Sequence, residues 1–359
     1  MIRVLVVDDS ALVRRLIVTA LADADDIEVV GTARDGYDAI DKVEDLRPDV
    51  VTLDIEMPNL DGIGALAVIH QRHPRLPVIM FSTLTERGAA ATLEALSRGA
   101  SDYVTKPSNT GSVSEGLASV REQMVPRIRA LAGMRRLTSA PRPAAPVAPA
   151  PVAAAPIARQ PAGLPQALVI GCSTGGPDAL AQVLPALPAD LGVPVLVVQH
   201  MPPVFTHMLA QRLDKVSSLT VREAVDGDVP RAGEVLIAPG DWHLRLRSTG
   251  AGVRVALDQG PQENFCRPAV DPLFRSAVEV YGGRVVAAVL TGMGQDGLEG
   301  ARTLAQHGAR VIAQDEATSV VWGMPGAVVQ SRLADQVLPL PQIARALVAA
   351  VRRTPVLAR

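Results

Sequence analysis

The sequence predicts an α/β protein built from two doubly wound domains, each with a parallel sheet. The chain has 359 residues, which is too long for one ordinary core and suits two domains. Short apolar runs of strand length alternate with helical patterns on both sides of a stretch rich in Pro and Ala, as is typical of parallel sheets covered by helices. We expect the first domain at residues 1–122, a helical tail and linker at 123–164, and the larger second domain at 165–355.

The first domain begins with a predicted strand from Ile2 to Val7, and Ser10 is expected to cap a helix from Ala11 to Leu21. Its other expected strands are residues 28–32, 50–53, 77–81 and 102–104. Ligands of doubly wound sheets bind at the carboxyl ends of the strands, so polar residues at those ends are candidate site residues.

Five such polar residues are Asp8, Asp9, Asp54, Ser82 and Lys106. Each Asp taken alone has an ordinary interpretation as a helix cap. Three crowded carboxylates, however, repel one another unless a hard dication neutralises them, and Mg²⁺ suits a site with few protein oxygens and retained water. The pattern therefore predicts a magnesium site with one ammonium group beside it.

The motifs Val-Val-Asp8-Asp9-Ser, Leu-Asp54-Ile-Glu-Met-Pro58 and Thr-Lys106-Pro107 make the first domain similar to the receiver domains of two-component response regulators. The resemblance implies a flavodoxin-like fold in which Asp54 accepts a phosphoryl group from a sensor histidine kinase. The implied Mg²⁺ ligands are the side chains of Asp8, Asp9 and Asp54 and the backbone carbonyl of Glu56.

Three further receiver roles follow from the same resemblance. Ser82 is expected to bond the phosphoryl group, Lys106 to pair with it, and Tyr103 to be the aromatic residue that switches rotamer. An amphipathic surface position with the hydroxyl in water is an equal alternative for Tyr103.

A helical stretch that includes Ser114 to Arg136 is followed by a segment dominated by Pro and Ala. This segment lacks the large apolar side chains that a core requires, and its prolines favour an extended polyproline conformation. We expect a semi-rigid spacer whose reach, roughly 75 Å for about 25 residues, permits docking of the two domains without fixing its geometry.

The second domain repeats the alternation, with expected strands at 167–170, 193–198, 234–237, 285–290 and 311–313. Its first strand runs into a glycine turn that presents Ser173, and Pro177 suits the first turn of the next helix. Gly171-x-Ser173-x-Gly175 matches the nucleophile elbow of serine hydrolases. A dinucleotide-binding loop fits less well, because Ser173 stands where that loop needs its second glycine.

A serine nucleophile needs a base within hydrogen-bond reach and a carboxylate that orients the base. His200 and Asp296 follow later strands and meet this need, although a buried structural histidine and a helix cap are their ordinary alternatives. His243 with Asp241 is a competing pair. Sequence patterns alone leave His200 and His243 open as the base.

The stretch from Leu168 to Val351 resembles the chemotaxis protein-glutamate methylesterase family. The shared motifs are Ile-Gly-Cys-Ser173-Thr-Gly-Gly-Pro, Gln-His200-Met-Pro-Pro-Val-Phe-Thr, Arg267-Pro-Ala-Val-Asp-Pro-Leu-Phe and Leu-Thr-Gly-Met293-Gly-Gln-Asp296-Gly. The resemblance implies a Rossmann-like domain, a triad of Ser173, His200 and Asp296, and an oxyanion hole at Met293 and Gly294. It further implies demethylation of glutamate methyl esters, with methanol release, and deamidation of certain glutamines on methyl-accepting chemoreceptors, with no cofactor for the hydrolysis.

Composition limits the partners and the compartment. Lys plus Arg number 35 against 37 for Asp plus Glu, so no polycationic surface for nucleic acid is expected. No apolar run approaches the roughly 20 residues that span a bilayer, and Cys172 and Cys266 match no zinc spacing. These features predict a cytoplasmic, reduced protein without membrane insertion.

Two other functions for the second domain are kept as alternatives to receptor demethylation. One is a non-catalytic output domain that binds a partner, and the other is a general small-molecule esterase.

Overall fold

The structure is a computed structural model, and it describes residues 1–107, 112–139 and 163–353. The chain divides into two compact units, a first unit, Met1–Pro143, and a second unit, Ala144–Arg359. The spacer predicted between the domains falls on residues 140–162, outside the described residues. Both units have parallel sheets, so the predicted doubly wound α/β class is confirmed.

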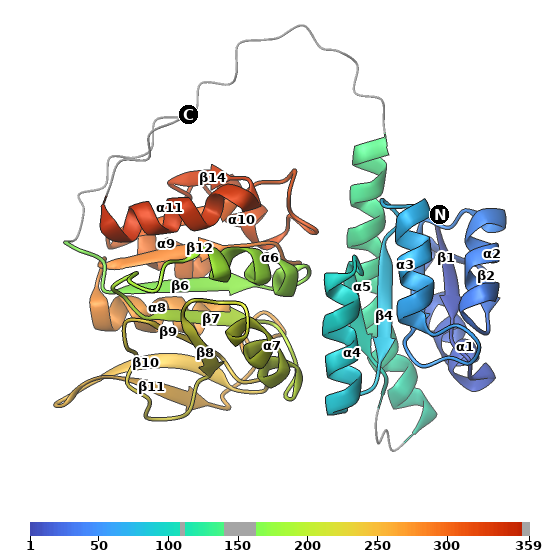
Figure 1. The fold of residues 1–359 in the computed structure, drawn as a ribbon, viewed down its shortest axis with the longest axis horizontal. Helices are drawn as coiled ribbons and strands as arrows, with labels where there is room; N and C mark the ends of the chain where they lie inside the picture. The colour runs from blue at the N-terminus through green and yellow to red at the C-terminus, as the bar shows by residue number, and fades with distance from the viewer. Residues whose placement is uncertain (108–111, 140–162, 354–359) are drawn as a thin grey trace, which may run out of the picture. The chain divides into compact units, whose positions relative to one another are not determined.

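The first unit contains a five-stranded parallel sheet in the order β2-β1-β3-β4-β5. Figure 1 labels β1, β2 and β4 of this sheet. Its strands are β1 (Ile2–Val7), β2 (Ile27–Ala33), β3 (Val50–Asp54), β4 (Val78–Ser82) and β5 (Asp102–Thr105). The chain moves from β1 to β2 on one side and then to β3 on the other, which opens a crevice between the carboxyl ends of β1 and β3. Asp8 and Asp54 stand at those two ends.

Five helices cover this sheet: α1 (Ala11–Ala22), α2 (Gly36–Leu46), α3 (Gly62–Arg72), α4 (Glu86–Ser97) and α5 (Val113–Ser139). Ser10 caps α1 as predicted, because its hydroxyl accepts a hydrogen bond from the N–H of Val13. Helix α5 continues past the boundary predicted at residue 122, and it contacts α1 and the sheet. Buried Val120, Met124 and Ile128 bind it to the first unit, so the tail predicted from residue 123 begins inside a packed helix.

The second unit contains a seven-stranded parallel sheet in the order β14-β13-β12-β6-β7-β9-β8. Its strands are β6 (Ala167–Cys172), β7 (Val195–Gln199), β8 (Thr220–Glu223), β9 (Glu234–Ile237), β12 (Val285–Val289), β13 (Arg310–Gln314) and β14 (Gln336–Leu338). Strand order reverses between β6 and β12, so the crevice of this sheet lies at their carboxyl ends. Ser173 and Thr291 follow those ends.

An antiparallel hairpin of β10 (His243–Thr249) and β11 (Gly252–Asp258) packs on α8, and the sequence analysis did not predict it. The helices of this unit are α6 (Gly176–Val183), the 3₁₀ turn η1 (Leu184–Ala186), α7 (Phe205–Asp214), α8 (Val270–Tyr281), α9 (Leu298–Gln306), α10 (Met324–Gln330) and α11 (Leu340–Arg352). Helix α8 contacts β6, β7 and β12, and α11 contacts α6, β12 and β13 (Figure 1). The core between the sheet and these helices consists of buried apolar side chains.

Candidate functional site

The first unit gathers its acidic residues at the crevice between β1 and β3. One oxygen each from Asp8, Asp9 and Asp54 lies within 4.8 Å of the others. Lys106 closes the cluster, with its ammonium 2.9 Å from Asp8 Oδ2 and 2.8 Å from Asp54 Oδ1. A cavity of about 230 Å³ opens here, lined by Asp9, Asp54, Glu56 and Ser82 among others. The predicted acidic residues, Lys106 and Ser82 therefore lie together at the carboxyl ends of the strands.

This donor set fits a hard cation. Burial raises the pKa of Asp54 to about 6, and the negative charge of Asp8 adds to that rise while Lys106 opposes it. Asp8 Oδ2 is buried without a properly aligned hydrogen bond, although the Lys106 ammonium is close to it. One ammonium thus leaves three crowded carboxylates incompletely compensated, and a dication bound by oxygen ligands would complete the balance.

The remaining receiver residues surround the same cavity or lie next to it. Ser82 is buried, and its hydroxyl donates to the Gly88 carbonyl at 3.1 Å. The Glu56 side chain is exposed, lies 3.5 Å from the Arg87 guanidinium and does not belong to the cluster of three Asp carboxylates. Tyr103 is a buried residue of β5, and burial raises the pKa of its hydroxyl. The exposed alternative for Tyr103 is therefore wrong.

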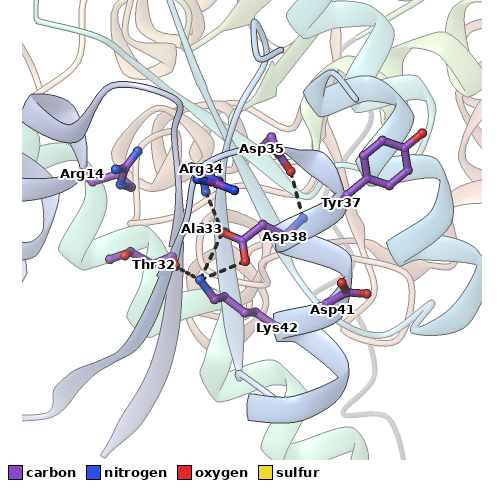
Figure 2. Close-up of a pocket in the computed structure, with 9 residues that line it drawn as sticks. All are labelled: Arg14, Thr32, Ala33, Arg34, Asp35, Tyr37, Asp38, Asp41 and Lys42. Carbon is purple, nitrogen blue, oxygen red and sulfur yellow. Dashed lines mark hydrogen bonds and ion pairs between the residues drawn. The ribbon is translucent and has the colours of Figure 1, made fainter. Parts of the chain in front are cut away.

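A second, larger polar cavity of about 540 Å³ lies between β2, α1 and α2 (Figure 2). Its charged side chains bond one another and the backbone: Lys42 donates to Asp38 at 3.1 Å and to the Thr32 carbonyl at 2.6 Å. Arg14, which also lines this cavity, donates to the carbonyls of Asp8 and Asp9, at 2.6 and 3.0 Å. One wall of the cavity is thus bonded to the backbone of the acidic cluster, but the cavity does not include Asp54.

In the second unit, the turn after β6 presents the Ser173 hydroxyl. The Ser173 N–H donates to the Thr291 carbonyl at 3.0 Å, and the Gly176 N–H donates to the Ser173 carbonyl at 2.7 Å. Gly175 has φ of 77°, a conformation that favours glycine. Within the described chain, the Ser173 hydroxyl has no hydrogen-bond partner. Among the described residues, no hydrogen bond therefore joins the Ser173 hydroxyl to His200, the predicted base.

His200 and Asp296 form a direct pair. His200 directly follows β7, and its Nε2 lies 2.7 Å from Asp296 Oδ2. The other ring nitrogen, Nδ1, is within hydrogen-bond distance of the Cys266 sulfur, at 3.4 Å. It is the ring nitrogen that no carboxylate holds. Burial by itself lowers the pKa of His200, but the neighbouring Cys266 side chain and the Asp296 carboxylate raise it above its usual range overall.

The Asp296 carboxylate lies at the start of α8. It accepts hydrogen bonds from the N–H groups of Val270 at 2.6 Å, Asp271 at 3.1 Å and Gly297 at 2.8 Å. Burial by itself raises the pKa of Asp296, but the bonds from His200 and from these backbone groups lower it below its usual range. These interactions stabilise the anionic form of Asp296. The carboxylate caps the N-terminus of α8, and it also accepts from the N–H of Gly297, just before α9.

His243, the competing base, has both ring nitrogens engaged by the backbone. Its Nδ1 accepts from the Ala269 N–H at 3.2 Å, which leaves Nε2 to donate to the Pro261 carbonyl at 2.9 Å. The ring is fully buried. Asp241 instead bonds the Arg267 guanidinium at 2.6 Å. The structure therefore gives His243 a structural position, and the Asp241 pair expected as an alternative does not form.

The segment Thr291–Gly294 follows β12 and lies against the Ser173 turn. A β-carbon at Gly292 would come within 2.9 Å of the Ser173 β-carbon, so only glycine fits this approach. The Gly292 carbonyl accepts from the N–H groups of Gly323 and Met324. In the part of the chain that the structure describes, the N–H groups of Met293 and Gly294 donate to no other group.

Both units are similar to known proteins. The CheB methylesterase model matches residues 168–347, and the response regulator receiver domain model matches residues 4–117. The chain belongs to the CheB methylesterase family. A relative from Nocardioides sp. is 55% identical over 96% of this chain and 95% of its own length, and one from Symbiobacterium thermophilum is 51% identical over 98% and 97%. Both are named protein-glutamate methylesterase/protein-glutamine glutaminase.

A solved structure of the same family is the methylesterase catalytic domain of Thermotoga maritima CheB. It is 47% identical, with a TM-score of 0.50, and covers 51% of this chain and 97% of its own. We therefore call the first unit the receiver unit and the second the methylesterase unit. In neither described unit is there a helix with both the length and the apolar character needed to cross a membrane.

The sequence analysis missed two residues that hold the methylesterase site together. The Gln199 amide donates to the Ser173 carbonyl at 2.9 Å and to the His200 carbonyl at 3.3 Å, so it ties the two predicted catalytic turns to each other. A β-carbon at Gly176 would come within 1.9 Å of Gln199 Oε1. The available signal was a buried polar residue that ends an apolar strand directly before His200.

Asn264 is the other missed residue. Its amide donates to Asp296 Oδ1 and to Asp271 Oδ2, at 3.0 Å in both cases, and so it separates two buried carboxylates. Burial and the neighbouring Asp296 raise the pKa of Asp271 to about 6. Asp271 belongs to the recognised motif that begins at Arg267, but nothing in the local pattern shows that it faces Asp296.

Proposed function

We propose that this chain is a phosphorylation-controlled serine hydrolase that removes methyl groups from glutamate methyl esters on chemoreceptors and deamidates specific receptor glutamines. The observation that carries the proposal is the 2.7 Å contact between His200 Nε2 and Asp296 Oδ2 beside the Ser173 turn. The phosphodonor is a chemotaxis histidine kinase, and the enzyme acts in the cytoplasm. The names of the relatives support glutamate methyl esters and glutamines of proteins as the groups that react.

In the acylation step, the Ser173 hydroxyl oxygen attacks the ester carbonyl of the glutamate side chain. Nδ1 of His200 accepts the serine proton, because Nε2 is already bonded to Asp296. Asp296 remains ionised and stabilises the imidazolium. The imidazolium then returns the proton to the leaving methoxide oxygen, which departs as methanol. When the substrate is glutamine, the proton goes to the leaving amide nitrogen, which departs as ammonia.

In the deacylation step, water attacks the acyl-Ser173 ester. His200 accepts the water proton and passes it to the Ser173 oxygen, which releases glutamate. We assign the oxyanion hole to the N–H groups of Met293 and Gly294, which have no intramolecular partner among the described residues. Each such donor is worth on the order of 3 kcal/mol of transition-state stabilisation.

For the receiver unit, we propose that Asp54 accepts the phosphoryl group. Asp8, Asp9, Asp54 and the Glu56 carbonyl would hold a Mg²⁺ ion, and this ion would neutralise phosphoryl oxygens when bound. Lys106 and Ser82 are the groups that would contact the phosphoryl oxygens, and buried Tyr103 is proposed as the rotamer switch. The crowding of the three carboxylate oxygens supports this ligand set.

The test is methanol release from a methylated receptor cytoplasmic domain, with acetyl phosphate present. We expect Ser173→Ala and His200→Ala to lower kcat by roughly 10⁴- to 10⁶-fold without unfolding the chain, because the nucleophile and its base act as a unit. His207→Ala is the matched control, since His207 is exposed on α7 and bonds Glu223. A folded His243→Ala variant as inactive as His200→Ala would contradict the assignment of the base.

A further inference from the structure

The turn Glu263–Cys266 adjoins His200 and is closed by two backbone hydrogen bonds. The Cys266 N–H donates to the Glu263 carbonyl at 2.9 Å, and the Glu263 N–H donates to the Cys266 carbonyl at 3.2 Å. Both central residues have positive φ, 51° at Asn264 and 61° at Phe265. Such two-residue turns favour Asn or Gly, because a β-carbon crowds the backbone there. Asn264 suits the turn, whereas Phe265 adopts it against its preference.

Side chains on both sides of Phe265 tie this turn to the proposed catalytic residues. Asn264, which precedes it, donates to Asp296 Oδ1 at 3.0 Å. Cys266, which follows it, lies 3.4 Å from His200 Nδ1. At the base of the turn, Glu263 forms an ion pair with Arg275 of α8 at 2.7 Å. The position of Phe265 relative to His200 and Asp296 is therefore fixed by its neighbours.

The Phe265 ring does not contribute to the core, since 96% of the residue is exposed. Among the large apolar residues reported as exposed in the described chain, it is the most exposed. A left-handed backbone at a bulky residue costs free energy, and so does an aromatic ring exposed to water. In the isolated chain, packing of the ring compensates for neither cost.

Two residues on other loops also have positive φ. Val204, four residues after His200, has φ of 72°, and Asp241 has φ of 66°. Asp241 is joined to the residue after Cys266, because its N–H donates to the Arg267 carbonyl at 3.1 Å. Asp adopts such a backbone readily, whereas Val and Phe adopt it at a cost. A costly backbone conformation close to a reactive group is typical of functional loops.

We propose that Phe265 is a specificity-determining contact that packs against apolar side chains flanking the methyl ester on the substrate protein. This inference rests on the proposed function. The ester must reach Ser173 and His200, so the protein surface around it must lie over the residues that adjoin them, and Phe265 is one of these. An aromatic ring with few rotamers gives apolar contact area at a low cost in side-chain entropy.

The experiment compares Phe265→Gly with the wild type, as full chains with acetyl phosphate and Mg²⁺. Glycine suits the positive φ, so the variant is expected to melt no lower than the wild type. We expect kcat/KM for the methylated receptor domain to fall at least about tenfold, and kcat/KM for p-nitrophenyl acetate to stay within about twofold. Phe265→Leu, which keeps an apolar side chain, should retain more receptor activity than Phe265→Gly.

Val216→Ala is the control, because Val216 is exposed in the same unit beyond the far end of α7, and it should leave both rates unchanged. The proposal is overturned by wild-type receptor activity in Phe265→Gly, or by equal losses on both substrates. A rise in p-nitrophenyl acetate hydrolysis without acetyl phosphate would also overturn it, since the ring would then act in restraint by the receiver unit. If the wild type hydrolyses p-nitrophenyl acetate but releases no methanol from receptor, the proposed function itself fails.

Discussion

The two ring nitrogens of His200 have different surroundings, and this difference predicts a pH dependence. Burial alone would lower the pKa of the His200 ring. Cys266 at Nδ1 and Asp296 at Nε2 favour the imidazolium and together raise this pKa. The base must be neutral to accept the serine proton. Esterase activity should therefore increase with pH as His200 loses its proton, with a midpoint above the value of 6.5 for ordinary histidine.

The measurement is kcat/KM for p-nitrophenyl acetate from about pH 5 to about pH 10. Asp296→Asn removes the carboxylate that favours the imidazolium, so it should move the midpoint to lower pH as well as reduce the rate. Cys266→Ala should also lower the midpoint while it leaves Ser173 and Asp296 in place. An unchanged midpoint in both variants would show that neither neighbour controls the protonation of His200.

Helices α8 and α9 cap each other through buried carboxylates. Asp296, just before α9, accepts from the first N–H groups of α8, and Asp271 in the first turn of α8 accepts from the Gly300 N–H of α9 at 2.6 Å. Asn264 donates to both carboxylates. This arrangement fixes the acid of the proposed triad to two helices, but it leaves two negative charges close together in a buried site.

Asp271→Asn tests how much the buried negative charge of Asp271 destabilises the folded state. Because the pKa of Asp271 rises from 3.8 to about 6 on folding, the folded state binds the extra proton between these values. The free energy of unfolding of the wild type should therefore decrease as pH rises through this window, by up to about 3 kcal/mol more than that of Asp271→Asn. Urea unfolding followed by tryptophan fluorescence reports this unit, since Trp242 and Trp322 are the only tryptophans. Asp190→Asn, exposed on the surface, is the control and should keep the wild-type slope.

Elements with a strong apolar signal were predicted from sequence, and elements defined by tertiary contacts were not. Central strands such as β6 and β12 are continuous buried runs, so their positions and the polar residues after them followed from the pattern. The short edge strands β8 and β14 bury little, and β10 alternates buried leucines with half-buried Arg245 and exposed Arg247. The choice between His200 and His243 likewise depended on contacts from distant segments, which only the folded structure shows.

The receiver and methylesterase units each have their own sheet and core, so any control of one by the other is a property of the whole molecule. We expect the receiver unit to restrain the esterase until Asp54 is phosphorylated. Phosphorylation adds roughly −1.5 to −2 charges, and Lys106 and Ser82 are placed to rearrange around them. Each tenfold increase in the active population needs about 1.4 kcal/mol, within the range of one or two charge-assisted hydrogen bonds.

Asp54→Asn should therefore stay at basal methanol release with acetyl phosphate present, while the wild type is activated. A fragment that starts at Gly163 retains the complete seven-stranded sheet, and the Thermotoga maritima catalytic domain is a structure of the corresponding part alone. This fragment should exceed the unphosphorylated full-length enzyme in kcat/KM on the same receptor domain. If it is no faster, the receiver unit does not restrain the esterase, and phosphorylation of Asp54 must act by positive activation, because removal of an inhibitor would have increased the rate.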